Sequence, residues 1–206
     1  MEDLRITALG TGDMGGAIAT ALSRRTRHTV QVRGSRIGSP SASQLIATLG
    51  IHEATDRAIT DSDVVFVVVP ALAIARAVAI RAGYRGIVVC VSVSNTVGRD
   101  GLPSSAEQIA AALPEARVVS AFTSMWSDVV RDPGAGQKTS VFVCSNDDGA
   151  KAAISRLAAE MGFDPINGGK LDTALYAEVL GALVVRLALD SGYGKNITFQ
   201  AFQAKP

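Results

Sequence analysis

Short apolar runs and helix-like segments alternate along most of the chain. Two of the runs, the unbroken run 64–69 and the run 87–93, are rich in β-branched residues, which is typical of strands buried on both faces of a parallel sheet. One of the intervening segments begins with a capping box, in which Ser104 is followed three residues later by Glu107. The alternation predicts an α/β fold with a doubly wound parallel sheet.

The predicted elements follow one another without a linker-like segment. Strands are expected at 4–9, 28–33, 64–69, 87–93, 117–121, 140–144, 163–167 and 197–202. Helices are expected at 14–24, 41–49, 71–81, 104–113, 147–161 and 171–189, with a short helical turn at 56–60. The segments 98–103 and 127–138 are rich in Pro and Gly or irregular in pattern, and we expect both to be loops.

The first predicted strand leads directly into a glycine-rich turn. Gly10-Thr11-Gly12-Asp13-Met14-Gly15 has the spacing G-x-G-x-x-G and opens the first predicted helix. In this pattern the first Gly makes the tight turn, the second lets the backbone approach a pyrophosphate, and the third lets the helix pack closely on the strand. The phosphates then lie on free N–H groups at the positive end of the helix. The segment therefore predicts a dinucleotide-binding βαβ unit.

The end of the second predicted strand distinguishes NAD from NADP. NAD-binding units carry an Asp or Glu there that binds the ribose 2′-OH, whereas this chain has Arg33-Gly34-Ser35-Arg36. A carboxylate would repel a 2′-phosphate, and arginine binds phosphate through paired hydrogen bonds. One charge-assisted hydrogen bond contributes about 1.5–3 kcal/mol, which favours NADP over NAD by roughly 10- to 100-fold. We expect Arg33, Ser35 and Arg36, helped by the hydroxyl of Thr11, to bind the 2′-phosphate of NADP(H).

The rest of the site is expected at the carboxyl ends of later strands, where doubly wound sheets bind their ligands. The nicotinamide is expected near Val69, Pro70 and Val93. The substrate is expected where the only tryptophan of the chain lies among hydroxyl groups. The candidates for that pocket are Phe122, Thr123, Ser124, Trp126 and Lys170.

Residues suited to acid–base catalysis are scarce. The chain has two histidines, His28 and His52, and neither falls near a predicted ligand-binding strand end. Carbonyl reduction usually needs a positioned proton donor, whereas hydride transfer to a second cofactor or to an activated imine needs mainly proximity and orientation. The scarcity favours the second kind of reaction. Lys170 is a candidate proton donor or a candidate ligand for a substrate carboxylate. The sequence assigns no catalytic residue, and we expect no metal site.

Composition excludes several other classes of protein. The chain of 206 residues is 48% hydrophobic and has a formal net charge of +1, which argues against nucleic acid and acidic membranes as partners. Cys90 and Cys144 lie in apolar runs and are expected to be buried free thiols, as in a reducing cytosol. The N-terminus lacks the pattern of a signal peptide, and the apolar segment 171–189 contains Asp172, Glu178 and Arg186. We therefore expect a cytoplasmic protein without a membrane span.

With these motifs the chain resembles the coenzyme F420-dependent NADP oxidoreductases, which transfer hydride between NADP(H) and an 8-hydroxy-5-deazaflavin. The family opens with a strand, the pattern G-T-G-x-[LM]-G and a second strand ending in G-S-R, here Gly10–Gly15 and Gly34–Arg36. The resemblance implies that Thr11, Ser35 and Arg36 contact the 2′-phosphate and that Val69-Pro70 lies at the nicotinamide.

The resemblance continues to the C-terminal part by order and spacing. It includes the stretches 118–122, 143–148 and 162–165 and the helix that carries Glu178. The chain departs from the family at Thr123-Ser124, where His or Asn followed by Thr is usual, at Lys170, where a neutral residue is usual, and at Leu175, where Arg is usual. These departures surround the expected pocket for the second substrate.

The sequence thus predicts an NADP-binding Rossmann domain, residues 1–145, and a C-terminal extension, residues 146–206, that packs on the same domain through its long apolar helix. The expected partner is a small-molecule hydride acceptor, and three functions stay open. They are hydride transfer between NADPH and a planar acceptor such as F420, reduction of a small imine or carbonyl compound by NADPH, and NADP binding by a non-catalytic sensor. Apolar residues on most faces of 171–189 further predict a homodimer.

Overall fold

A single eight-stranded sheet runs through the computed structural model, which describes residues 3–79, 83–93, 102–134 and 139–204. Its strand order is β3-β2-β1-β4-β5-β6-β7-β8. The strands are β1 (Arg5–Leu9), β2 (Thr29–Arg33), β3 (His52–Glu53), β4 (Val64–Val67), β5 (Ile87–Cys90), β6 (Arg117–Ser120), β7 (Ser140–Ser145) and β8 (Asp164–Asn167). The strands from β3 to β6 are parallel, β7 is antiparallel to β6, and β8 is parallel to β7. The predicted doubly wound α/β fold is confirmed, with two reversed strands at one side of the sheet.

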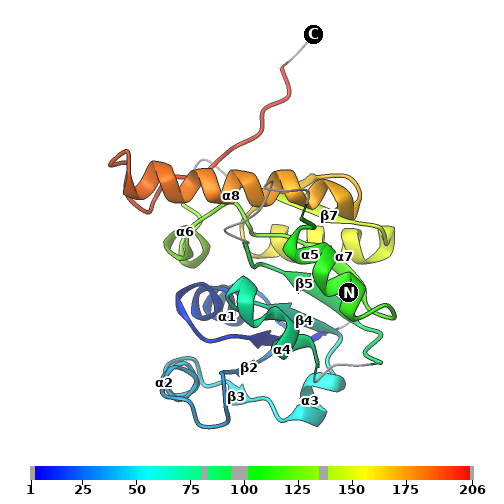
Figure 1. The fold of residues 1–206 in the computed structure, drawn as a ribbon. Helices are drawn as coiled ribbons and strands as arrows, with labels where there is room; N and C mark the ends of the chain where they lie inside the picture. Colours follow the sequence, from blue (N-terminus) through cyan, green and yellow to red (C-terminus); the bar gives the residue numbers. More distant parts are fainter. Residues whose placement is uncertain (1–2, 80–82, 94–101, 135–138, 205–206) are drawn as a thin grey trace.

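Helices cover both faces of this sheet (Figure 1). One face packs against α1 (Asp13–Arg25), α2 (Pro40–Leu49), α6 (Ser127–Arg131) and α7 (Asp148–Glu160). The other packs against α3 (Asp56–Thr60), the 3₁₀ turn η1 (Ala71–Ala73), α4 (Ile74–Ala79), α5 (Ser105–Ala112), the 3₁₀ turn η2 (Leu171–Thr173) and the start of α8 (Ala174–Leu189). Successive residues of a strand point to opposite faces. The run 64–67 therefore contributes Val64 and Phe66 to one core and Val65 and Val67 to the other.

The loop predicted at 127–138 is wrong at its start, because residues 127–131 form α6. Val129 and Val130 of this helix are buried in the core beside α1, so packing decides the conformation of a segment too short to show a helical period. Residues 135–138 lie outside the described residues, as do 98–101 of the second predicted loop and 80–82 at the end of the predicted helix 71–81.

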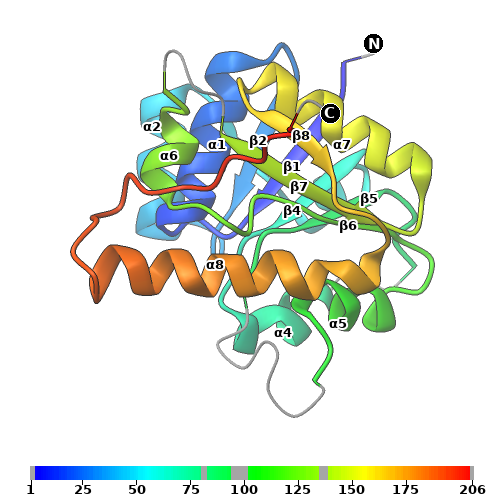
Figure 2. The same cartoon turned by 90° about the horizontal axis from the view of Figure 1, so that it is seen from above.

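The strand predicted at 197–202 is also wrong. Thr198 makes one isolated antiparallel bridge with Met125, and the carbonyl of Phe199 accepts a hydrogen bond from the backbone N–H of Ser140. The tail instead turns back from the end of α8 and passes α6 on its way to β7 (Figure 2). The sequence also missed β3, whose two residues are too few to show an alternating pattern.

The C-terminal part extends the same sheet. β8 pairs with β7 from Ser140↔Asp164 to Val143↔Asn167, so the predicted boundary between 145 and 146 falls between two hydrogen-bonded strands. The division into two domains stays a prediction. Among the described residues, no helix has both the length and the hydropathy needed to cross a membrane.

The long helix α8 links the two edges of the sheet. It starts after the segment that follows β8, and this segment leads toward the amino edge of the parallel strands because β7 and β8 are reversed. It then crosses to the carboxyl edge, where Gly181 is buried against Val93 and the carbonyl oxygen of Thr123. This close approach brings the helix backbone directly onto the loops that follow β5 and β6.

The crossing predicts that Gly181→Ala destabilises the protein, although alanine favours helices over glycine by about 1 kcal/mol. The added Cβ would collide with the carbonyl oxygen of Thr123 and lie 3.1 Å from Cγ2 of Val93. We expect a loss of about 1–3 kcal/mol in the free energy of unfolding, measured by urea denaturation. Gly16→Ala in α1 is the matched control, because its Cβ would meet only Leu45 at ordinary distances of 3.5 and 3.7 Å. Equal stabilities for the two variants would contradict this interpretation of the crossing.

Candidate cofactor and substrate site

The glycine-rich turn between β1 and α1 leaves the start of the helix open. Gly10 has a φ of +111°, and a Cβ there would collide with the carbonyl of Val68. Gly12 is exposed at the N-cap of α1, makes no side-chain capping bond, and has no heavy atom within 4 Å of where its Cβ would lie. The N–H groups of the first helical turn therefore have no intrahelical partner and face an unobstructed surface. This is the geometry that binds a pyrophosphate.

The predicted 2′-phosphate residues lie together beside this turn. Ser35 and Arg36 are exposed, directly after the end of β2. The hydroxyl of Thr11 is hydrogen-bonded to that of Ser41 at 2.7 Å, and either oxygen can be the donor. The structure thus brings two loops and the start of α2 to one place, with a cation and three hydroxyl groups.

Two of the neighbouring residues were missed by the sequence analysis. Ser39 is buried at the N-cap of α2, and its Oγ has no hydrogen-bond partner among the described residues. A Cβ at Gly34 would collide with that Oγ, so glycine at 34 allows α2 to start against the end of β2. Ser41, the partner of Thr11, lies in the first turn of α2. The available signal was the Ser39-Pro40 pair, which is a typical helix start.

Arg33 differs from Arg36 in having its guanidinium already bound. Its Nη1 donates to the carbonyl of Ala54, and its Nη2 lies 2.7 Å from Oδ1 of Asp56. Its side chain is 13% exposed. The structure therefore places Arg33 between β2 and the chain that follows β3, and leaves Arg36 as the exposed cation of this loop.

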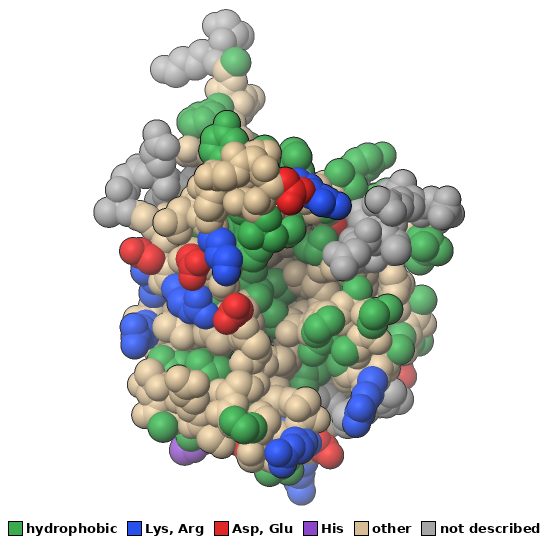
Figure 3. All heavy atoms as spheres, turned by 60° about the vertical axis from the view of Figure 1, so that its left-hand side comes forward, with side chains coloured by type: hydrophobic (Ala, Val, Ile, Leu, Met, Phe, Trp, Pro, Cys, Tyr) green, Lys and Arg blue, Asp and Glu red, His purple; other side chains and the backbone are tan. Residues whose placement is uncertain are grey.

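The expected nicotinamide residues lie at the ends of β4 and β5. The hydroxyl of Ser92 donates to the carbonyl of Val69 at 2.5 Å, which ties the two strand ends together. Pro70 follows as an exposed residue, and Val93 lies beneath α8 at Gly181. Figure 3 brings this edge of the sheet forward and shows a hollow below the level of α8, with hydrophobic side chains in it and charged side chains beside it.

The predicted pocket residues after β6 are mostly buried. Phe122 is 1% exposed and packs between Phe66 and Phe163, with ring centroids at 6.1 and 5.5 Å. It belongs to the core. Its φ of +61° is uncommon for a bulky residue and costs about 1–3 kcal/mol. Thr123 and Ser124 are also buried, at 5% and 2% exposure, and the strained turn at Phe122 directs them beneath α8.

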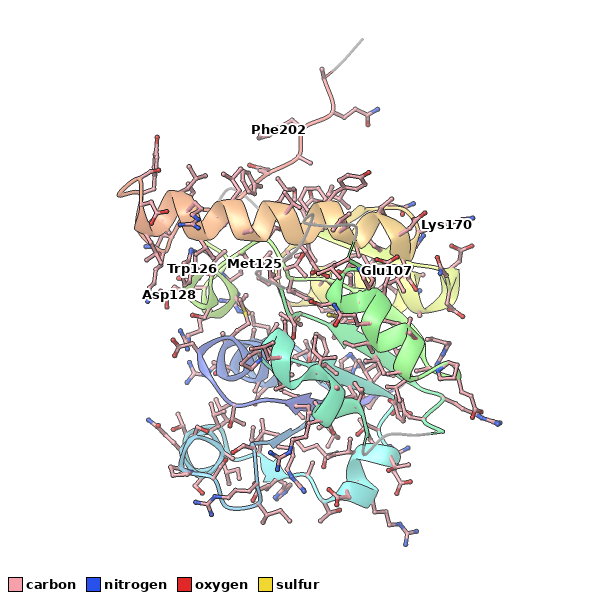
Figure 4. All side chains as sticks on the ribbon, viewed as in Figure 1. Glu107, Met125, Trp126, Asp128, Lys170 and Phe202 are labelled. Carbon is pink, nitrogen blue, oxygen red and sulfur yellow. The ribbon has the colours of Figure 1, made fainter. Side chains whose placement is uncertain are left out.

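Trp126 and Lys170 lie at opposite ends of the α8 layer (Figure 4). The Nε1 atom of Trp126 is buried and has no partner among the described residues, and Nζ of Lys195 lies 5.4 Å from the centre of its ring. Lys170 is eleven residues before Gly181, which is about 16 Å along a helix. It is exposed and lines a separate cavity of about 500 Å³ with Glu107, Asn146 and Asp172. The structure does not bring Lys170 to the other pocket candidates.

His28 and the two cysteines are placed for structural roles. His28 is buried, its Nδ1 accepts from the N–H of Leu4, and its Nε2 lies 3.3 Å from Glu160. Burial raises the pKa of both thiols, at Cys90 with a smaller contribution from the charge of Glu178. Neither thiol is therefore a ready nucleophile. In the described ranges no three His, Cys, Asp or Glu side chains are grouped to hold a metal ion.

Comparison with known proteins points to the same chemistry. The sequence model of a family described as NADP oxidoreductase, coenzyme F420-dependent, matches residues 5–96. No curated protein matches the chain. The fold is similar to a candidate F420-dependent NADP-reductase from Arthrobacter sp. FB24, with a TM-score of 0.80 and 29% identity over 93% of this chain and 96% of that one.

Two further solved structures share this fold. A hypothetical protein from Sinorhizobium meliloti has a TM-score of 0.72 and 25% identity over 84% of this chain and 88% of that one. A pyrroline-5-carboxylate reductase from Coxiella burnetii has a TM-score of 0.59 over 92% of this chain and 81% of that one, and its 16% identity supports the fold alone.

The family match and the similar Arthrobacter protein indicate an NAD(P)-dependent oxidoreductase. The matched segment includes the glycine-rich turn, the loop after β2 and Val69-Pro70, and the stretches after residue 96 that the resemblance also uses lie outside it. That prediction is confirmed: the chain is similar to the coenzyme F420-dependent NADP oxidoreductases, in sequence over residues 5–96 and in fold over nearly its whole length.

Proposed function

We propose that the protein transfers hydride between NADP(H) and a planar acceptor such as the deazaflavin coenzyme F420. The observation that supports the cofactor is the loop after β2, where Ser35 and Arg36 are exposed beside the hydroxyl pair of Thr11 and Ser41. The acceptor is supported by the description of the matched family and of the Arthrobacter protein.

The two ends of the proposed cofactor site do different work. At one end, the open first turn of α1 holds the pyrophosphate on backbone N–H groups. Arg36, Ser35 and Thr11 hold the 2′-phosphate, and Arg33 supports the loop while its own charge is paired with Asp56. The charged groups of the site therefore gather at the adenosine end.

The other end holds the two reacting rings by shape. Val69, Pro70 and Val93 form the surface for the nicotinamide, and the hollow beneath α8 accepts the second ring. NADPH supplies the hydride, and the oxidised acceptor takes up the hydride with one proton. The hydroxyls of Thr123 and Ser124 lie nearby but are buried, so we propose that the proton comes from solvent. Such a transfer requires proximity and orientation above all.

A direct assay tests the reaction. Purified protein is mixed with NADPH and oxidised F420, and both absorbance bands are followed. We expect equal amounts of NADPH oxidised and F420 reduced. Consumption of an imine or carbonyl compound with NADPH, and none of F420, would instead favour the alternative reductase, and tight NADPH binding with no acceptor turned over would favour a sensor.

The cofactor assignment predicts a selective effect of Arg36→Ala. Removing the exposed guanidinium should weaken NADPH binding roughly 10-fold or more and leave NADH binding nearly unchanged, because only NADPH carries the 2′-phosphate. Binding is measured by isothermal titration calorimetry. Arg85→Ala is the matched control, since this exposed arginine pairs with Glu115 near the amino edge of the sheet. Equal losses for the two nucleotides would argue against a 2′-phosphate contact.

We also propose a homodimer that buries the outer face of α8. Tyr176, Val179, Leu183, Val185 and Leu189 are 42% to 69% exposed on this helix, an apolar stripe too wide for a free surface. Leu183→Glu should convert particles with the mass of two chains into monomers, as measured by sedimentation equilibrium. Ala152→Glu on the exposed face of α7 is the control. A wild-type monomer would refute the proposal.

A further inference from the structure

The loop that carries Arg36 is held by the edge strand β3. The carboxylate of Glu53 accepts the backbone N–H of Gly38 with both oxygens, at 2.9 and 3.1 Å. Glu53 pairs in register with Val32 of β2, and the N–H of Ala54 donates to the carbonyl of Val32. The carboxylate is therefore fixed by sheet pairing to the strand from which the loop departs.

Gly38 occupies a position that makes this contact effective. The N–H of Ser39 donates to the carbonyl of Arg36 at 3.3 Å, which closes a four-residue turn from Arg36 to Ser39. Gly38 is the third residue of the turn and has a φ of +68°, as type II turns require. Arg36 opens this turn and Ser39 ends it as the N-cap of α2. A bond to the central N–H thus restrains both the cation and the helix start.

We propose that Glu53 is a positioning residue for NADP preference, acting by holding the Arg36–Ser39 turn in the conformation that presents Arg36 to the 2′-phosphate. The inference rests on the proposed binding of NADP. The carboxylate of Glu53 has two opposing effects on the binding of the 2′-phosphate. Its charge repels the phosphate, and its hydrogen bond to Gly38 orders the turn. The turn is exposed to solvent, which weakens the repulsion, whereas the bond to the backbone is direct. The ordering effect is therefore the larger one.

The test measures the affinities for 2′,5′-ADP and 5′-AMP by isothermal titration calorimetry. These nucleotides differ only in the 2′-phosphate. Glu53→Ala should weaken the binding of 2′,5′-ADP roughly 5- to 20-fold, which is less than the loss of a direct charge-assisted bond to the phosphate, because Glu53 acts through the turn. Its affinity for 5′-AMP should stay within about twofold of the wild-type value, because the phosphate-binding turn of α1 is untouched. Glu53→Gln keeps an acceptor oxygen for Gly38 and removes the charge. It should bind 2′,5′-ADP nearly as tightly as the wild type, or more tightly.

Two controls separate positioning from general stability. Glu115→Ala removes one exposed carboxylate near the amino edge of the sheet and should change neither affinity. Amide exchange of Gly38, followed by NMR without nucleotide, should be faster in Glu53→Ala than in the wild type or Glu53→Gln.

Several results would overturn the inference. Tighter binding of 2′,5′-ADP by Glu53→Ala would show that repulsion dominates. An equal loss of affinity for both nucleotides would show that Glu53 supports the whole nucleotide site, or binds the ribose itself. A wild-type preference for 2′,5′-ADP that survives in Glu53→Ala would refute the positioning role alone. Wild-type protein that binds the two nucleotides equally would refute the NADP assignment together with it.

Discussion

The carboxyl edge of the sheet, where we propose that the cofactor binds, depends on a contact between backbones at which no side chain fits. A Cβ at Gly15 of α1 would collide with the carbonyl of Gly10, and a Cβ at Gly10 would collide with the carbonyl of Val68 beyond β4. Three elements from different parts of the chain therefore meet at van der Waals distance. The contact fixes the start of α1 against the ends of β1 and β4, and so directs the free N–H groups of its first turn to the edge where the other strands end.

This part of the fold could be predicted because its causes are local. The glycines that allow the contact, the β-branched runs at 64–69 and 87–93, and the absence of an acid after β2 are all contained in short stretches of sequence. The contributions of Ser41 and Glu53 could not be predicted in the same way. Each depends on a partner, Thr11 or Gly38, that folding brings close, and β3 is too short for its pattern to reveal that it pairs at all.

The placement of Lys170 shows a second reason why sequence reasoning fails. Lys170, a lysine before a predicted helix, was a candidate for the same pocket as the residues that follow β6. β7 and β8 run opposite to the central strands, so the residues after β8 lead toward the other edge. Nothing in the composition of a buried strand encodes its direction, because the same side chains pack equally well either way. The reversal instead gives α8 its course, from the amino edge across to the carboxyl edge at Gly181.

That course explains how a chain with few acid–base groups can still shape a reaction site. α8 covers the loop after β6 so closely that Thr123 and Ser124 are buried, and the strained turn at Phe122 persists because the ring is locked between Phe66 and Phe163. Strain of this kind survives only where the surrounding packing over-determines it. The hydride end of the site is thus a rigid and largely apolar surface, while the charged groups gather at the adenosine end. Such a division suits a reaction between two flat rings, in which the protein contributes binding and orientation more than proton transfer.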